Sequence, residues 1–340
     1  MKKGRVILSL APMVLSLSVP FAQPAAAAPT VKLVFRSSFI QSWYCRNWDS
    51  SRWEQELSML RDAGITEVII QTTVDTTPGI KTAFYPTSIA GYTANEIDLL
   101  DKVLTVADSL EMKVRVGVGF NKDWWSKGAG DRAWLTREAN ENKLFVDEIA
   151  ENYAEHPSFG GWYISYEISN ITATTSIKRA NLNNFFKIMV TEMKLKTPGK
   201  TVMVSPFFNS RYSTLGSLTN WSAAIENVFS GTNVDILALQ DSIGVNYNQI
   251  SQLAGIFTYT KKGTDAAKMQ LYANNETFAL TASGFITAPQ ARLTSQMAAV
   301  NMYVKGYIAF SLNHYQGKYN EDPAAVKGYL DYLDYYLASK

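Results

Sequence analysis

Short apolar runs alternate with amphipathic stretches along most of the chain. Eight of these runs are rich in β-branched and aromatic residues, a composition that favours strands. They are KLVFRSSF (32–39), TEVIIQTT (66–73), MKVRVGVGF (112–120), GWYISYE (161–167), TVMVSPFF (201–208), VDILALQD (234–241), MQLYANNE (269–276) and GYIAFSLN (306–313).

The stretches between the runs carry apolar residues at helical spacing. Ser51 and Glu54 fit a capping box at the start of one helix, and Gly64 is placed to end it. Thr93 and Glu96 repeat the capping box ahead of a second helix. Further helices are predicted over 144–153, 182–193 and 323–339.

Strands that alternate with helices in this way predict an α/β fold, and eight such pairs predict a single (β/α)8 TIM barrel over residues 28–340. A doubly wound open sheet is the alternative. Such a sheet usually has a glycine-rich phosphate turn after its first strand, and RSSFIQSWYC (36–45) contains no glycine. The barrel is therefore the preferred interpretation.

Residues 1–27 are predicted to be a secretory signal peptide. Lys2, Lys3 and Arg5 precede a short apolar stretch, and AQPAAAAPT (22–30) offers small residues for cleavage near Ala27. An uncleaved anchor is the alternative, although the apolar stretch is shorter than the ~20 residues of a typical span. We therefore expect a secreted protein, extracellular or associated with the cell wall, with no membrane span after cleavage.

Removing that segment changes the charge balance. The formal net charge moves from +2 to −1, because three basic residues and no acidic ones are lost. No basic cluster remains to suggest nucleic acid as a partner. Cys45 is the single cysteine, so stability must come from a large core, which an apolar fraction of 46% can supply. We expect a monomer.

In TIM barrels the chemistry lies at the C-terminal ends of the strands. The residues predicted there are aromatic, amide or acidic, a mixture that suits an oligo- or polysaccharide, because rings cover its C–H faces and polar groups take its hydroxyls. The expected substrate-binding residues are Trp43, Gln71, Asn121, Trp124, Trp125, Tyr166, Asn209, Gln240, Asp241, Asn275, His314 and Tyr315. The alternative for each tryptophan is packing under a loop, and Trp53 and Trp162 are expected in the core.

Glu167 and Glu276 are the predicted catalytic residues. They end the fourth and seventh predicted strands, which lie nearly across a barrel mouth from each other. Glycoside hydrolysis needs two carboxyl groups flanking the scissile bond, one protonated and one ionised. The apolar neighbours of Glu167 suggest the acid/base, and the two asparagines before Glu276 suggest an ionised nucleophile. One of the two could instead be an ordinary ion-paired carboxylate.

Other chemistries fit the sequence less well. With two histidines a multi-histidine metal site cannot be built, so we expect no metal and no cofactor. His156 is expected to be structural. No G-x-S-x-G elbow is present, and Cys45 has no activating neighbour in the sequence, so a buried inert thiol is expected.

Several strand-end segments resemble a known bacterial family. GGWYISYEIS (160–169), DILALQDSIGV (235–245), NNETF (274–278) and IAFSLNHY (308–315) resemble the secreted, glycoside-hydrolase-like barrels grouped as domain of unknown function 4434. The resemblance implies a TIM barrel acting on a glycan, with Glu167, Gln240, Asp241 and Glu276 at motif positions.

The sequence departs from the wider pattern of retaining TIM-barrel glycosidases at one place. Those enzymes usually have Asn before the acid/base, whereas Tyr166 precedes Glu167 here. An inverting mechanism, with Asp241 taking one catalytic role, therefore stays open. A glycan-binding barrel without catalysis is the alternative function, and an interaction scaffold is a third.

Overall fold

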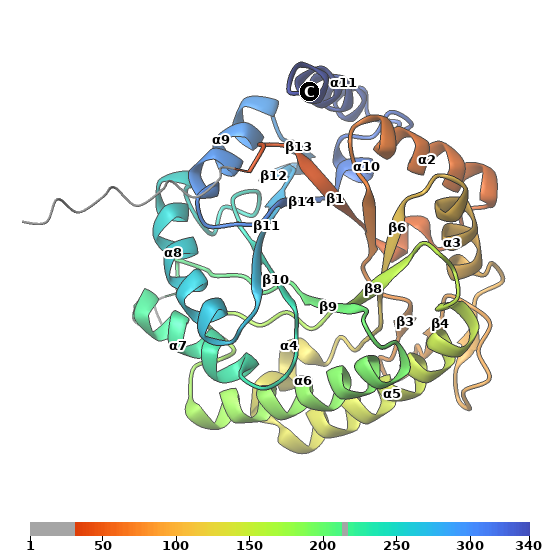
Figure 1. Cartoon of the computed structure of the whole chain (residues 1–340), viewed down its shortest axis with the longest axis vertical. Helices are drawn as coiled ribbons and strands as arrows, with labels where there is room; N and C mark the ends of the chain where they lie inside the picture. The colour runs from red at the N-terminus through yellow and green to blue at the C-terminus, as the bar shows by residue number, and fades with distance from the viewer. Residues whose placement is uncertain (1–30, 213–216) are drawn as a thin grey trace, which may run out of the picture.

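The computed structural model describes residues 31–212 and 217–340, and its centre is a closed barrel of parallel strands (Figure 1). The predicted signal peptide lies outside these residues. Around the barrel the strand order is β1-β14-β11-β10-β9-β8-β6-β2, and β1 pairs with β2 to close it. The barrel strands are β1 (Phe35–Ile40), β2 (Glu67–Ile70), β6 (Lys113–Gly117), β8 (Phe159–Ile164), β9 (Thr201–Val204), β10 (Ile236–Gln240), β11 (Gln270–Glu276) and β14 (Tyr307–Phe310). The predicted TIM barrel is confirmed.

The main helices form a ring outside the barrel (Figure 1). They are α2 (Ser50–Asp62), α3 (Leu99–Ser109), α5 (Arg132–Tyr153), α6 (Ser176–Lys196), α7 (Leu218–Phe229), α8 (Ile250–Ala266), α9 (Gln290–Val300) and α11 (Pro323–Ala338). Both predicted capping boxes are wrong. Asp49 caps α2 by accepting from the N–H of Arg52, and Ser51 lies inside that helix. Asp98, whose side chain accepts from the N–H of Asp101, caps α3, while Thr93 belongs to a strand. A capping side chain so close to the helix outweighs the pattern five residues earlier.

Additional elements follow the C-terminal ends of the barrel strands and surround the mouth. After β2 and β6 the chain forms a small sheet of four strands, and after β11 it forms an antiparallel hairpin. These strands are β3 (Val74–Asp75), β4 (Thr82–Ala83), β5 (Thr93–Ala94), β7 (Gly119–Phe120), β12 (Phe278–Thr281) and β13 (Gly284–Thr287). Short helices α1 (Ser42–Cys45), α4 (Trp124–Lys127) and α10 (Leu312–Tyr315), and the 3₁₀ turn η1 (Gly128–Gly130), complete the rim.

Two apolar layers hold the fold together. Inside the barrel, a cluster that includes Tyr163, Ala238 and Ile308 fills the space between the strands. A larger layer packs between the strands and the helices. Trp53 and Trp162 are fully buried, as predicted. Because side chains alternate along a strand, the cluster inside the barrel identifies which later residues of each strand face the mouth.

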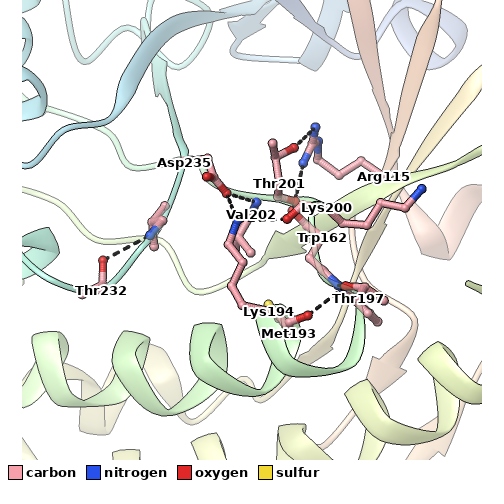
Figure 2. A network of polar contacts seen from close by, with 11 residues as sticks. Arg115, Trp162, Met193, Lys194, Thr197, Lys200, Thr201, Val202, Thr232 and Asp235 are labelled. Carbon is pink, nitrogen blue, oxygen red and sulfur yellow. Dashed lines mark hydrogen bonds and ion pairs between the residues drawn. The ribbon is translucent and has the colours of Figure 1, made fainter.

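A network of polar contacts lies at the N-terminal end of the barrel (Figure 2). Asp235 accepts hydrogen bonds from the N–H of Val202 and from Lys194, at 2.7 and 2.6 Å. Buried Arg115 donates to the carbonyl of Thr201 and pairs with Glu67, each at 3.0 Å. A cavity of about 540 Å³ opens beside Arg115 and Glu67. This face is the stability end of such barrels, so we place the site at the other end.

Other expectations for single residues can be compared with the structure. Cys45 is fully buried, as predicted, and burial raises the pKa of its thiol. His156 contacts Asp108 at 2.7 Å in the loop before β8, which is a structural role. Within the described residues, no helix combines the length and apolarity that crossing a membrane requires.

Candidate functional site

Glu167 and Glu276 both face the mouth of the barrel. Glu276 ends β11, four residues beyond Tyr272, which packs with the cluster inside the barrel. Glu167 follows β8, four residues beyond Tyr163 of the same cluster. An even spacing keeps both side chains on the inner face. Between β8 and β11 stand β9 and β10 on one side of the ring and four strands on the other, so the two carboxyl groups approach from nearly opposite directions.

Glu167 is held at the edge of the mouth by its own backbone and by Gln240. The indole N–H of Trp124 donates to the Glu167 carbonyl at 3.1 Å, and Gln240 bonds the carboxyl group. Part of the side chain remains exposed. Burial raises the pKa of Glu167 to about 7, and the hydrogen bond from Gln240 opposes the shift. Such a pKa suits a group that gives and takes a proton near neutral pH.

Glu276 lies deeper, with 5% of its surface exposed. Its Oε2 accepts from the N–H of Val245 at 2.9 Å, in the loop after β10. Burial and the negative charge of Asp241 raise the pKa of Glu276 well above its ordinary value. The N–H groups of Val245 and Gly244 and the charge of Arg292 oppose that shift.

The predicted difference between the two environments is therefore wrong. We expected the asparagines before Glu276 to hold it ionised, but Asn274 donates to Ser205 at 3.0 Å and Asn275 donates to Asp241 at 2.9 Å. Neighbouring side chains on a strand point to opposite faces, so Asn275 cannot reach the carboxyl group beside it. Both pKa values are raised, and burial is the largest cause in each case.

Asp241 is on the same rim but on the other side of the barrel wall. It follows inward-facing Gln240, so its side chain points toward the helices, where it is fully buried. Its carboxylate accepts from the N–H groups of Ile243 and Glu276, both at 3.2 Å, and from the amides of Asn275 and Gln296. The structure thus corrects our expectation that Asp241 could contact substrate or replace one catalytic glutamate. It positions the strand end instead.

Several other expected sugar ligands are buried behind the wall. Trp124 is 1% exposed and packs against Tyr166, with ring centroids 5.4 Å apart. Tyr166 and Asn121 both donate to Glu138 of α5, at 2.8 and 2.7 Å. Asn209 and Asn275 are likewise buried, and Asn209 accepts from the N–H of Arg211 within its own loop. These five residues offer no surface to a ligand, which corrects the prediction.

The remaining expected ligands do reach the surface of the mouth. Trp43 and Trp125 are 58% and 59% exposed, and Trp125 lies against Phe120 at 6.4 Å between ring centroids. Gln71, Gln240, His314 and Tyr315 are partly exposed. Burial and the charge of Glu276 raise the pKa of Tyr315 to about 12, so this phenol lies within the field of the Glu276 carboxyl group.

Sequence reasoning missed the residues of other segments that support Glu276. Gln296 and Arg292 come from α9, and Arg292 donates to the carbonyl of Glu276 at 2.9 Å. Val245 contributes only its backbone N–H, which no residue type signals. Phe278 and Phe285 of the hairpin were also missed, although two phenylalanines so soon after Glu276 were a visible signal.

Carboxyl, amide and aromatic side chains line the mouth. Among residues 31–212 and 217–340, no three His, Cys, Asp or Glu side chains gather closely enough to hold a metal ion. The carboxyl groups of Glu167 and Glu276 are of the kind that can transfer protons or attack as nucleophiles.

Comparison with known proteins agrees with this architecture. The family model described as Domain of unknown function (DUF4434) matches residues 36–325. No curated protein sequence matches the chain significantly.

Solved structures share the barrel at low identity. A candidate alpha-L-fucosidase from Bacteroides thetaiotaomicron VPI-5482 is 23% identical over 93% of this chain and 99% of its own, with a TM-score of 0.76. A beta-galactosidase from Marinomonas ef1 is 12% identical over 89% of this chain and 60% of its own (TM-score 0.57). A GH18 chitinase from Pseudoalteromonas aurantia is 11% identical over 89% and 99% (TM-score 0.54). At these identities the likeness establishes the TIM-barrel fold alone.

Proposed function

The chain belongs to the DUF4434 family, and from the geometry of its mouth we propose that it is a glycoside hydrolase acting on a polysaccharide or cell-surface glycan. One observation carries the proposal. Two buried or partly buried glutamates, Glu167 and Glu276, project into the mouth from nearly opposite strands, and each has a raised pKa. Binding a sugar requires aromatic and amide groups, but it does not require two opposed carboxyl groups.

We propose a retaining mechanism with Glu167 as the acid/base. Its partial exposure lets it meet both the leaving group and the water that later enters. In the first step, Glu167 gives its proton to the glycosidic oxygen while Glu276 attacks the anomeric carbon and forms a glycosyl ester. In the second step, Glu167 takes a proton from water, and the water oxygen displaces Glu276. The sugar leaves with its original anomeric configuration.

The assignment of Glu276 as nucleophile rests on the donors around it. Val245 donates to Oε2, and Gly244 and Arg292 add positive potential, so the carboxylate form is held in one orientation. A nucleophile with 5% exposure is fixed and is shielded from bulk water. Asp241 opposes ionisation, and the proton on Glu276 has to leave before attack.

The names of proteins that share the fold support a sugar substrate without choosing one. They are described as acting on fucosides, galactosides and chitin. A purified sample of this protein should therefore be screened against a broad panel of polysaccharides and aryl glycosides, with release of reducing ends or of the aryl group as the readout.

The decisive variants are Glu167→Gln and Glu276→Gln. Glu54→Gln, which changes an exposed side chain on α2, is the matched control. On any substrate that the screen finds, the first two should lower turnover by about 10²- to 10⁴-fold and the control should not. If both glutamine variants kept the wild-type rate, the proposal would fail. Sugar binding that survives in every protein without any turnover would instead favour a glycan-binding barrel.

We also propose that the protein is secreted after removal of residues 1–27. The support is the sequence pattern of Lys2, Lys3 and Arg5 followed by an apolar stretch and small residues. Mass analysis of protein recovered from culture medium should find a new N-terminus close to Ala27 or Ala28. Recovery of the intact N-terminus there would rule this out.

A further inference from the structure

Five aromatic side chains follow one another along one side of the mouth, and they belong to three segments far apart in the sequence. Phe278 and Phe285 come from the hairpin after β11, His314 and Tyr315 from α10 after β14, and Trp43 from α1 after β1. The strands β11, β14 and β1 are adjacent in the barrel, so these segments lie side by side (Figure 1). We call these five residues the aromatic strip.

Ring contacts run through the strip without a gap. Phe285 lies 5.0 Å from Phe278 and 6.4 Å from Tyr315, measured between ring centroids. Tyr315 lies 4.5 Å from His314, which lies 4.9 Å from Trp43. Phe285 and Trp43, at the two ends, are 55% and 58% exposed, while Tyr315 between them is partly exposed. Large apolar side chains left open in a row are a feature of binding surfaces.

The hairpin is tied to the loop that holds Glu276. The N–H of Leu280 donates to the carbonyl of Gly244 at 2.7 Å, and the next residue, Val245, donates to Glu276. Thr287 at the other end of the hairpin donates to the carbonyl of Tyr315 at 2.7 Å. The first bond joins the hairpin to the loop whose N–H contacts Glu276, and the second joins it to α10, so the strip has a fixed position beside Glu276.

The strip carries no charge that would select an acidic sugar. Burial lowers the pKa of His314, so its imidazole is neutral at neutral pH. The nearby guanidinium of Arg292 is occupied by the carbonyls of Glu276 and Phe278. An uncharged aromatic surface suits the C–H faces of neutral sugars, one sugar on each exposed ring.

We propose that Phe285, Tyr315 and Trp43 form three successive stacking positions for a neutral polysaccharide chain, so that the site binds internal stretches of the polymer rather than a terminal sugar alone. This inference rests on the proposed function only in assuming that the glycosidic bond between Glu167 and Glu276 is the one that is cleaved. The binding itself is independent of turnover and can be measured without it.

Affinity electrophoresis of the full chain tests the proposal. The probes are hydroxyethyl cellulose, xylan, galactomannan and laminarin as neutral polymers, and polygalacturonate and alginate as anionic ones. Wild-type protein and Glu276→Gln should both be retarded by at least one neutral polymer. Trp43→Ala and Phe285→Ala should each weaken that retardation by about fivefold. Leu195→Ala, which removes a side chain 68% exposed on α6, should not change it.

Chain length provides the second measurement. With oligosaccharides of the retarding polymer, calorimetry on Glu276→Gln should show affinity rising from two to at least three sugar units, and Trp43→Ala or Phe285→Ala should flatten that rise. Equal affinity for the disaccharide and the longer chains would overturn the proposal, as would retardation by the anionic polymers alone or retardation that neither substitution changes.

Retardation by polymers and turnover of substrates test the two proposals separately. If no polymer retards the protein but aryl glycosides are cleaved, the strip proposal is wrong and the hydrolase stands. If retardation and its loss in Trp43→Ala and Phe285→Ala are seen without turnover of any substrate, the strip stands and the hydrolase is wrong.

Discussion

The backbone N–H of Glu276 donates to the carboxylate of Asp241 at 3.2 Å, yet the two carboxyl groups lie on opposite sides of the barrel wall. Glu276 faces the mouth and Asp241 faces α9, where Gln296 holds it. Through this contact Asp241 fixes the end of β11, and its charge raises the pKa of Glu276. Because the two side chains point to opposite sides of the wall, the carboxyl group of Glu276 reaches the mouth and that of Asp241 does not.

Replacing Asp241 with Asn should move the pH profile of kcat/KM to lower pH. The substitution removes the charge that raises the pKa of Glu276, so Glu276 ionises at lower pH than in the wild type. Four N–H groups donate to the two oxygens of the Asp241 carboxylate. In the Asn variant two of them would face an NH₂ group and lose their acceptor, which should lower the free energy of unfolding by about 1–3 kcal/mol. A profile that does not move would show that the charge of Asp241 is not felt at Glu276.

The wild-type profile itself should be bell-shaped and centred near neutral pH. Glu167 must be protonated at the first step, and the protonated fraction falls above about pH 7. Glu276 must be ionised, and the ionised fraction falls below about pH 8, so activity should peak between these two values and fall on either side. An optimum near pH 4–5, where unshifted carboxyl groups titrate, would contradict both pKa directions.

Glu276→Gln should make the protein more stable at high pH. Folding raises the pKa of Glu276 from 4.5, so the folded state favours the proton, and stability is lost as the pH rises through the folded pKa. A glutamine avoids that loss and should gain at least about 1 kcal/mol in the free energy of unfolding at pH 9. At pH 4 the two proteins should be equally stable. Denaturant unfolding at both pH values checks this, with Glu54→Gln as the control.

Azide should distinguish the roles of the two glutamates. With a substrate that carries a good leaving group, azide should restore turnover to a small-side-chain variant of either residue. Glu167→Ala should then give a glycosyl azide of retained configuration, because Glu276 still forms the ester. Glu276→Ala should give the inverted azide by direct attack. NMR of the products reads the configuration, and the reverse pattern would exchange the two assignments.

Trp124→Phe should lower kcat more than it changes KM. The indole donates to the carbonyl of Glu167 and is 1% exposed, so its loss displaces the acid/base rather than a sugar contact. The free energy of unfolding should fall by about 1–2 kcal/mol, because a buried carbonyl loses its donor. A large rise in KM with an unchanged kcat would instead place Trp124 in contact with the sugar.

Tyr166→Phe should act on stability and leave KM unchanged. The phenol donates to Glu138 at 2.8 Å behind the wall, and this bond opposes the upward shift that burial gives the pKa of Glu138. Its loss should cost about 1–3 kcal/mol, and more at pH 8 than at pH 5, because an ionised Glu138 then lacks a donor. Tyr212→Phe, at a side chain 56% exposed, is the control.

The sequence determined the architecture of this protein. Eight apolar runs separated by amphipathic stretches admit few folds, and each run became a barrel strand. The same rule placed Glu167, Asp241 and Glu276 on one rim, since the C-terminal ends of parallel strands meet at one face. Position along a strand also separates Gln240, which faces the mouth, from Asp241, which does not, but applying that rule requires knowing which face is inside.

Tertiary structure decided which rim residues face the mouth. Glu138 of α5 accepts hydrogen bonds from Tyr166 and Asn121, and Gln296 of α9 donates to Asp241. No local sequence pattern predicts which face of each helix packs against the barrel, so these contacts could not be predicted. The aromatic strip likewise exists only because β11, β14 and β1 are neighbours in the closed ring. Burial, which sets both raised pKa values, depends on all of these contacts at once, and for that reason the sequence could name two carboxyl groups but not their protonation.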